Sequence, residues 1–224
     1  MFEVAELGLK LTKQEFEEKE GPLHASLLQV QRELQQSNRS VIIVVSGVEG
    51  AGKGQVVNRL NKWLDSRGME TNAFWDETDD QTLRPRYWRF WRAMPQKGRI
   101  GIMFGSWYTR PIVERVFGKM AEPEYEQRLQ EIADFERMLG LDGVILIKLW
   151  FHMPRNKVEK QLKMDAGNPG MNTRKSPWSK RFTRHYDKFM EISEIAIRKT
   201  DQGHAPWHVI EASEERHRDI TTGQ

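Results

Sequence analysis

Short apolar runs along the chain predict the strands of a buried sheet. Residues 41–45 form a continuous run of β-branched side chains, which is typical of a strand covered on both faces. Further apolar runs predict strands at 71–75, 100–104, 143–151 and 207–210. Longer and more polar stretches separate these runs, so the connections have room for helices.

The stretches between the strands carry apolar residues at the three- and four-residue spacing of amphipathic helices. This spacing predicts helices over 53–66, 111–118, 124–139, 156–164 and 180–200. In the last of these, we expect the inward side chains to be Phe182, Tyr186, Phe189, Ile192 and Ile195. Strands that alternate with helices predict an α/β fold, with a parallel sheet and helices on both of its faces.

Two stretches stand apart from this alternation. Residues 1–37 are an N-terminal leader and a polar helix, and we expect Gly21-Pro22 to end the leader, so that the helix starts near Leu23. Residues 165–180 are rich in Gly, Asn, Pro and basic side chains, which predicts a mobile loop or a lid. No domain boundary is visible, and we expect one domain over 1–224.

The segment after the first predicted strand has a phosphate-binding pattern. It fits G-x-x-x-x-G-K between a strand and a helix. Glycines let backbone N–H groups wrap around phosphate oxygens, and the helix that follows points its positive end at them. Lys53 supplies a cation for the outer phosphates. We therefore predict a P-loop rather than a chance glycine-rich turn, and its phosphate-binding residues are Gly47, Gly50, Ala51, Gly52, Lys53 and Gly54.

The position after the lysine departs from the usual motif. Gly54 stands where a Ser or Thr hydroxyl normally contacts Mg²⁺. The run GAGKG is the form of adenylate-kinase-like small-molecule kinases, which favours phosphoryl transfer to a small acceptor over GTPase or motor proteins. Together with the five predicted strands, it predicts a P-loop kinase-like three-layer fold with a five-stranded parallel sheet. The metal is then left to carboxylates, and Glu49 is the nearest candidate ligand. The alternative for Glu49 is a solvated acid in a loop.

Composition excludes several other classes of protein. The chain has 38% apolar and 30% charged residues, as ordinary globular proteins do, and no cysteine for disulfides or thiolate metal sites. The net charge of +3 is too small to argue for nucleic acid. No apolar run is long enough to cross a bilayer, and the first residues lack the features of a signal peptide. We expect a cytoplasmic protein that binds neither nucleic acid nor membrane.

The basic residues are nevertheless clustered, which suggests a local anionic ligand. We expect Arg89 of one cluster, and Lys180 and Arg181 of another in the predicted lid, to contact phosphate. Arg110, after the third predicted strand, is a further candidate, because a kinase must neutralise charge on both donor and acceptor. Solvated helix faces with surface ion pairs are the alternative. The clusters are Arg84, Arg86, Arg89 and Arg92, and Arg174, Lys175, Lys180, Arg181 and Arg184.

Aromatic and histidine side chains near the strand ends allow two interpretations. Trp107 and Tyr108 could stack a nucleotide base, although aromatic residues at strand ends are more often part of the core. His152 and His185 have no ligand-like neighbours in the sequence, so we interpret them as structural.

The P-loop is one of several segments that together point to a known family. The others are PRYWRFWRAMPQKGRIGIMF at 85–104, SWYTR at 106–110, FERML, DGVILIKLWFH, RHYDKFMEISEIAIRKT and APWHVIEA. With these segments the chain resembles the polyphosphate kinase 2 family from about Leu23 onward, and it is most similar to the amino-terminal half of the tandem polyphosphate:AMP phosphotransferases. The resemblance implies a nucleotide phosphotransferase that uses Mg²⁺, inorganic polyphosphate and adenine nucleotides (AMP, ADP or ATP).

The resemblance also implies roles for particular residues. Lys53 matches the P-loop lysine of the family, and Arg110 matches the arginine after the Ser-Trp-Tyr triplet. Glu49 stands at the P-loop aspartate, so these three are the expected catalytic residues and Glu49 is the expected metal ligand. The third strand of the family normally ends in Asp-Arg, whereas this chain has Phe104 and Gly105. The missing aspartate would be the Walker B carboxylate, which implies the loss of one Mg²⁺ contact.

Two other functions stay open at this point. The chain can be a catalytically degenerate half that binds polyphosphate or nucleotide and supports an active partner, either a second homologous domain or another subunit. The amino-terminal half of the tandem form is degenerate in this way. The chain can also be an ATP-dependent nucleoside monophosphate kinase, which GAGKG allows but the other segments do not favour.

Overall fold

The computed structural model describes residues 1–74, 77–167 and 179–224, which build a five-stranded parallel sheet. The strands are β1 (Ser40–Gly47), β2 (Met69–Ala73), β3 (Ile100–Phe104), β4 (Val144–His152) and β5 (Trp207–Glu211). They lie in the order β2-β3-β1-β4-β5. All the predicted strands are present, although β2 begins at Met69 and ends at Ala73 rather than covering 71–75.

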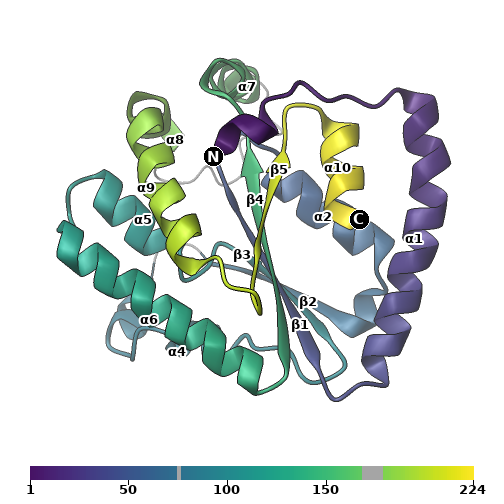
Figure 1. Ribbon diagram of the computed structural model, residues 1–224, viewed down its shortest axis with the longest axis horizontal. Coiled ribbons are helices and arrows are strands. Elements are labelled where there is room, and N and C mark those ends of the chain that lie inside the picture. The colour runs from purple at the N-terminus through teal and green to yellow at the C-terminus, as the bar shows by residue number, and fades with distance from the viewer. Residues whose placement is uncertain (75–76, 168–178) are drawn as a thin grey trace.

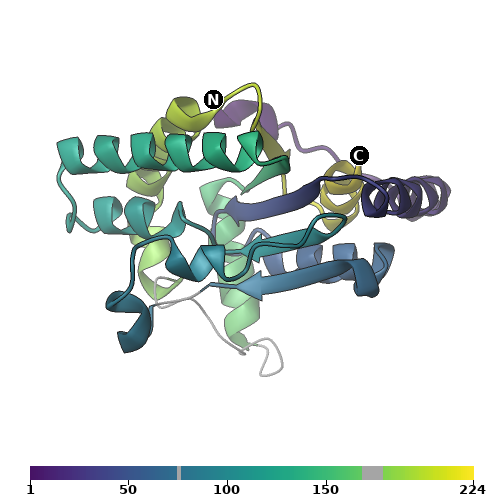
Figure 2. The same ribbon diagram turned by 90° about the horizontal axis from the view of Figure 1, so that it is seen from below.

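Helices cover both faces of this sheet (Figure 1). One face carries α1 (Lys13–Gln35), α2 (Lys53–Trp63) and α10 (Glu215–Gly223). The other carries α5 (Thr109–Val116), α6 (Glu122–Leu141) and α9 (Tyr186–Thr200). Figure 2 shows α5 and α6 lying side by side. The predicted three-layer α/β fold is therefore confirmed, with a core on each side of the sheet.

Shorter helices and turns connect these layers. They are α3 (Asp79–Thr82), α4 (Trp88–Trp91), α7 (Arg155–Gly167), α8 (Ser179–Phe182) and the 3-10 turns η1 (Phe2–Ala5), η2 (Ser66–Gly68) and η4 (Thr183–His185). The prediction of a single helix over 180–200 is wrong, because η4 separates α8 from α9. Ile195, which was expected to point inward, is exposed, and Ala196 and Ile197 of the same helix are buried instead. Most of the predicted lid, 168–178, lies outside the described residues.

The N-terminal helix corrects another prediction. Gly21 and Pro22 do not interrupt it, since α1 is continuous from Lys13 to Gln35 and starts at a capping box of Thr12 and Glu15. Both residues of the Gly-Pro pair are exposed. Water can therefore satisfy the carbonyl group that the missing proline N–H leaves free. Within the described ranges, we find no helix long and apolar enough to cross a membrane.

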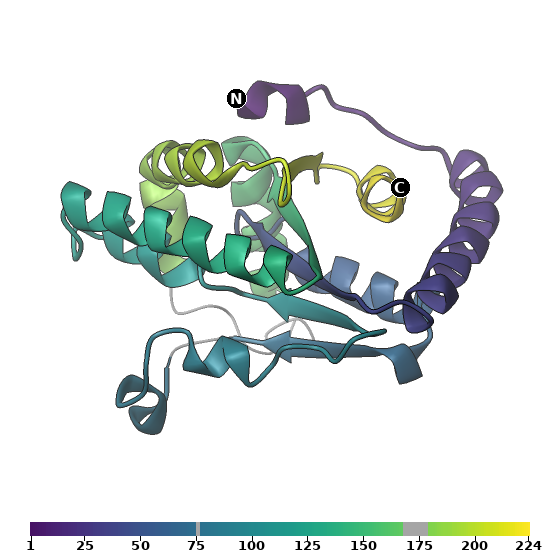
Figure 3. The same ribbon diagram turned by 60° about the horizontal axis from the view of Figure 1, so that its bottom comes forward.

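The first residues are attached to the end of the sheet. Glu211 of β5 accepts hydrogen bonds from the backbone N–H groups of Gly8 and Leu9. His152 of β4 is stacked on Phe2 and is hydrogen-bonded to Glu6 through Nε2. Burial lowers the pKa of His152, and the Glu6 contact acts against that shift. Figure 3 shows this stretch leading from η1 to α1.

Candidate phosphate-binding site

The P-loop connects the end of β1 to the start of α2. Gly47 has φ 134°, and a Cβ there would lie 2.2 Å from the carbonyl oxygen of Phe151 on the neighbouring strand. Gly52 is the N-cap of α2 and has φ 73°. Side chains rarely adopt such a backbone, so glycine is required at both positions. The loop therefore has the conformation that its glycine pattern predicts, and it places the first N–H groups of α2 where they can bind an anion.

Lys53 is folded back onto its own loop. Its Nζ donates hydrogen bonds to the carbonyl oxygens of Gly47 at 2.9 Å and Val48 at 2.7 Å. Burial lowers the pKa of Lys53, and the negative charge of Glu49 acts against this shift. A bound phosphate would add negative charge beside the ammonium group, so it would also favour the charged form.

The described residues around the P-loop do not form a metal site by themselves, without the oxygens of a bound phosphate. Glu49 is partly buried and close enough for its charge to act on Lys53. Among the described residues, no group of three or more His, Asp or Glu side chains is placed to hold a metal ion. Mg²⁺ is commonly held by one or two carboxylates together with substrate phosphates. Glu49 fits that arrangement only when a phosphate ligand supplies the other oxygens.

The turn after β3 lies next to the P-loop, because β1 and β3 are paired with Val45 opposite Phe104. Gly105 has φ 78°, and a Cβ on it would lie 2.5 Å from the backbone oxygen of Phe74. Trp107 and Tyr108 are buried in the core on the side of α6. Of the two interpretations for these aromatic residues, the core position is therefore the one observed.

A buried ion pair holds this turn from behind. Glu136 of α6 accepts hydrogen bonds from Trp107 Nε1 at 3.0 Å and Tyr108 Oη at 2.7 Å. Lys148 of β4 donates to Glu136 at 2.7 Å and to the carbonyl oxygen of Thr200 at 2.7 Å. Burial lowers the pKa of Lys148, whereas Glu136 acts to raise it. Burial also raises the pKa of the Tyr108 hydroxyl, which therefore acts as a neutral donor to Glu136.

A cleft of about 300 Å³ lies on the outer side of the same turn. It brings together two of the predicted arginines, Arg89 and Arg110, around Glu77. Arg110 forms ion pairs with Glu77 and with Glu114, and Arg89 Nε lies 3.9 Å from Glu77. Its lining residues include Glu77, Arg84, Arg86, Tyr87, Arg89, Ser106, Trp107, Arg110, Glu114 and Arg128. The cleft thus brings several guanidinium groups together with the carboxylates of Glu77, Glu114 and Glu124.

The other arginines of this cluster also have contacts. Arg84 and Arg92 lie over the ring of Trp88, at 5.1 Å and 5.0 Å from its centroid. Arg86 forms an ion pair with Glu131. Burial, followed by the charge of Glu131, raises the pKa of Tyr87 to about 12. The predicted cluster is therefore partly an ion-pair surface, and Arg89 is the member that lies beside Glu77 together with Arg110.

The basic residues of the predicted lid are not joined to this site in the described structure. Arg174 and Lys175 lie outside the described residues, and so does the side chain of Lys180. Arg181 is exposed on α8. Their predicted phosphate contacts stay predictions.

Sequence reasoning missed Glu77 and Arg128 in the cleft and Arg218 beside the P-loop. Glu77 lies in an acidic stretch that has no recognisable motif. Arg128 lies at a polar position of a strongly periodic helix. Arg218 follows the last strand with no motif around it. No local sequence pattern marks any of these three residues as part of a site.

Known sequences resemble this chain along almost its whole length. The profile of the Polyphosphate kinase 2 family matches residues 10–224. The chain belongs to the polyphosphate kinase 2 family. It is 40% identical to a polyphosphate:AMP phosphotransferase from Pseudomonas aeruginosa over its whole length, which is 45% of that protein. This polyphosphate kinase 2 family member thus spans about half the length of the two Pseudomonas phosphotransferases that it matches.

Solved structures agree with the family assignment. A crystal structure described as a polyphosphate kinase 2 from Pseudomonas aeruginosa is 38% identical and superposes with a TM-score of 0.90, covering 100% of this chain and 45% of that one. A polyphosphate kinase 2 from Arthrobacter aurescens, at 24% identity, superposes with a TM-score of 0.89 over 97% of this chain and 78% of that one. The second likeness concerns the fold alone.

Proposed function

We propose that this chain holds inorganic polyphosphate in its P-loop and exchanges a terminal phosphate with AMP or ADP. The observation that carries the proposal is the pairing of β1 with β3. The carboxyl ends of paired parallel strands lie about 5 Å apart. The P-loop and the arginine-lined cleft therefore start from adjacent points of one sheet edge, as a donor and an acceptor site must.

The residues divide between these two sites. The N–H groups from Gly50 to Gly54 and the ammonium group of Lys53 would bind the phosphate chain. Arg110 and Arg89 would bind the phosphate of the nucleotide, and Glu77 would have to release them. An oxygen of that nucleotide phosphate forms the new bond to phosphorus while the P–O bond of the polyphosphate breaks, and the leaving chain keeps the electron pair. Such transfers depend mainly on positioning and charge.

Magnesium is part of the proposal. Mg²⁺, bound by phosphate oxygens, would neutralise part of their charge. Glu49 is the carboxylate that the P-loop would offer to it. The third strand ends at Phe104, which cannot bind a metal, and we propose that this Walker B position is degraded. The name of the Pseudomonas relative, polyphosphate:AMP phosphotransferase, supports the choice of substrates.

The end of β3 also favours a second function. With Phe104 and Gly105 at these positions, the chain could bind polyphosphate without transferring phosphate and support an active homologous domain. Both functions need the P-loop to bind polyphosphate. They differ in turnover.

The direct test combines purified chain, Mg²⁺, polyphosphate and AMP or ADP, and measures new ADP or ATP. Turnover that is abolished in Lys53→Ala supports the enzyme. Absence of turnover, together with calorimetric binding of tripolyphosphate, supports the binding half. Lys53→Ala should weaken tripolyphosphate binding by about 10- to 100-fold, because charge-assisted hydrogen bonds contribute about 1.5–3 kcal/mol. The control is Lys62→Ala, at an exposed position near the other end of α2, which should bind as the wild type does. Equal affinity of the two variants would contradict a phosphate-binding role for Lys53.

A further inference from the structure

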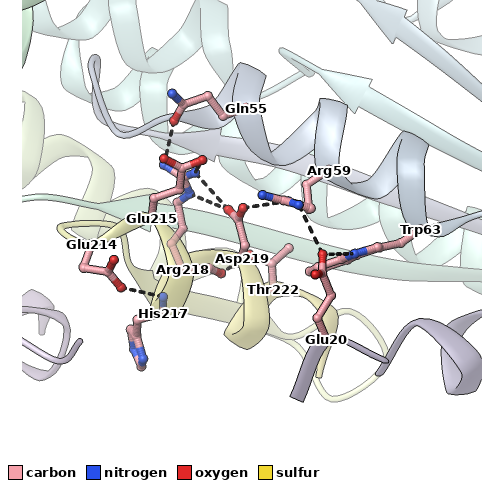
Figure 4. A network of polar contacts seen from close by, with 10 residues as sticks. All are labelled: Glu20, Gln55, Arg59, Trp63, Glu214, Glu215, His217, Arg218, Asp219 and Thr222. Atoms are coloured by element: carbon pink, nitrogen blue, oxygen red, sulfur yellow. Dashed lines mark hydrogen bonds and ion pairs between the residues drawn. The ribbon is translucent and has the colours of Figure 1, made fainter. Parts of the chain in front are cut away.

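The C-terminal helix α10 is packed against the start of the P-loop helix. Arg218 of α10 is almost completely buried, with 4% of its side chain exposed. Its Nη1 lies 1.9 Å from the point that a Cβ on Gly52 would occupy, so the guanidinium group lies directly against this glycine. The same nitrogen donates a hydrogen bond to Gln55 Oε1 at 3.0 Å (Figure 4). One arginine therefore contacts both the N-cap and the first turn of α2.

The charge of Arg218 is compensated within a network. Its Nε and Nη2 donate to Asp219 Oδ1 at 3.0 Å and 2.8 Å. The other oxygen of Asp219 accepts from Arg59 Nε at 3.0 Å, and Arg59 Nη1 donates to Glu20 at 3.2 Å. Figure 4 shows this chain of contacts running from α10 through α2 to α1. Glu215 also lies 4.0 Å from Arg218 Nη2. Because the two arginines lie among three carboxylates, the network adds little positive field at the P-loop, and its effect on the loop is geometric.

We infer that Arg218 is a positioning residue for the phosphate-binding loop, acting through Gly52 and Gln55. The inference rests on the proposed function, in which the P-loop binds polyphosphate. Gly52 must keep φ 73° for the following N–H groups to face a ligand. The guanidinium group fills the side of Gly52 on which a side chain would have stood, and it is tied to Gln55 one turn further on. Without it, the start of α2 is free to move away from the geometry that binds phosphate.

If the network only held the helices together, substitutions in it would have a different effect. Any break in the network would then lower the free energy of unfolding and leave ligand affinity unchanged in the folded protein. Arg59 provides the matched control, because it also binds Asp219 but lies on α2 nearly two turns beyond Gly52. Its hydrogen bonds lead to α1 and α10 rather than to the loop.

The experiment compares Arg218→Met with Arg59→Met in the full chain. Urea unfolding measures the stability of each variant, and calorimetry measures tripolyphosphate affinity under conditions where both are folded. We expect both variants to be less stable, and only Arg218→Met to bind tripolyphosphate about tenfold more weakly, which corresponds to about 1.4 kcal/mol. Unchanged affinity in Arg218→Met, or an equal loss in both variants, would overturn the inference.

Gln55→Leu and amide hydrogen exchange test the role of Arg218 in two further ways, the second of which does not depend on ligand binding. Gln55→Leu removes the hydrogen-bond acceptor at an exposed position, so it should fold and bind about threefold more weakly. Amide hydrogen exchange of residues 50–55 requires no ligand, and it should be faster in Arg218→Met and Gln55→Leu than in Arg59→Met. If the wild-type chain does not bind tripolyphosphate, the proposed function fails and exchange alone decides the role of Arg218. Equal exchange in all variants would exclude that role.

Discussion

Gly54 stands where the usual P-loop motif has a hydroxyl, and Gly105 stands where the third strand of the family continues into an arginine, yet the surroundings of the two glycines are opposite. A Cβ on Gly54 would meet nothing within 4 Å among the described residues. A Cβ on Gly105 would lie 2.5 Å from the backbone oxygen of Phe74, and Gly105 also has φ 78°. A hydroxyl could therefore be added to the P-loop without moving the backbone. An arginine could not be added after β3 unless the turn changed its conformation.

The departure at Gly54 and the departure at Gly105 are therefore of different kinds. At the P-loop, a chemical group is missing from an arrangement that could still hold it. At the end of β3, the turn itself has a conformation that excludes the group. The turn is also fixed from behind by Glu136 and Lys148, which hold Trp107 and Tyr108. Variants can test how firmly each of the two regions is held.

The largest effect is expected for Lys148→Met, which breaks the support behind the β3 turn. The substitution leaves Glu136 charged and buried, with 1% of its side chain exposed. Removal of one partner of a buried ion pair typically costs about 3–5 kcal/mol. Urea unfolding should show a loss of that size in the free energy of unfolding.

Two further variants test the cause of this loss. The double variant Glu136→Gln/Lys148→Met should recover much of the stability, because the amide oxygen can still accept from Trp107 and Tyr108 while no buried charge is left. Lys199→Met, which breaks an exposed pair with Glu126, should change stability by less than about 1 kcal/mol. A loss in Lys148→Met no greater than in Lys199→Met would contradict the role of the buried pair.

The sequence predicts local features of this chain better than contacts between distant residues, for physical reasons. The strand at 41–45 and the P-loop have local signals, since a β-branched run and a glycine spacing directly determine backbone structure. The helix α1 was predicted to break at Gly21-Pro22, but the exposure of this pair allows water to replace the lost hydrogen bond. The contact of Arg218 with Gly52 joins distant parts of the chain, so no local pattern could predict it.

The second prediction compares Gly105→Ala with Gly54→Ala. Gly105→Ala should lower the free energy of unfolding by about 2–4 kcal/mol, because a left-handed backbone costs about 1–2 kcal/mol for a side chain and the clash with Phe74 adds to it. Gly54→Ala lies in the first turn of α2 and should raise stability by about 0.5–1 kcal/mol. Thermal unfolding of both variants measures the signs. The same sign in both would show that the two glycines do not differ as described.

The smallest effect is expected where the two regions meet, at Phe104. Its backbone is a regular part of β3 opposite Val45, so Phe104→Asp restores the carboxylate that the resemblance implies without changing Gly105. The lost packing of a partly buried ring should lower stability in Phe104→Asp and in the matched control Phe104→Asn alike. Only the aspartate can share Mg²⁺ with a phosphate chain beside Glu49, and we expect up to about tenfold tighter tripolyphosphate binding in the presence of Mg²⁺. Calorimetry with and without Mg²⁺ measures that difference. If both variants bind equally in Mg²⁺, the end of β3 has lost more than its carboxylate, and the rigid turn around Gly105 is then the part of the site that sets the limit.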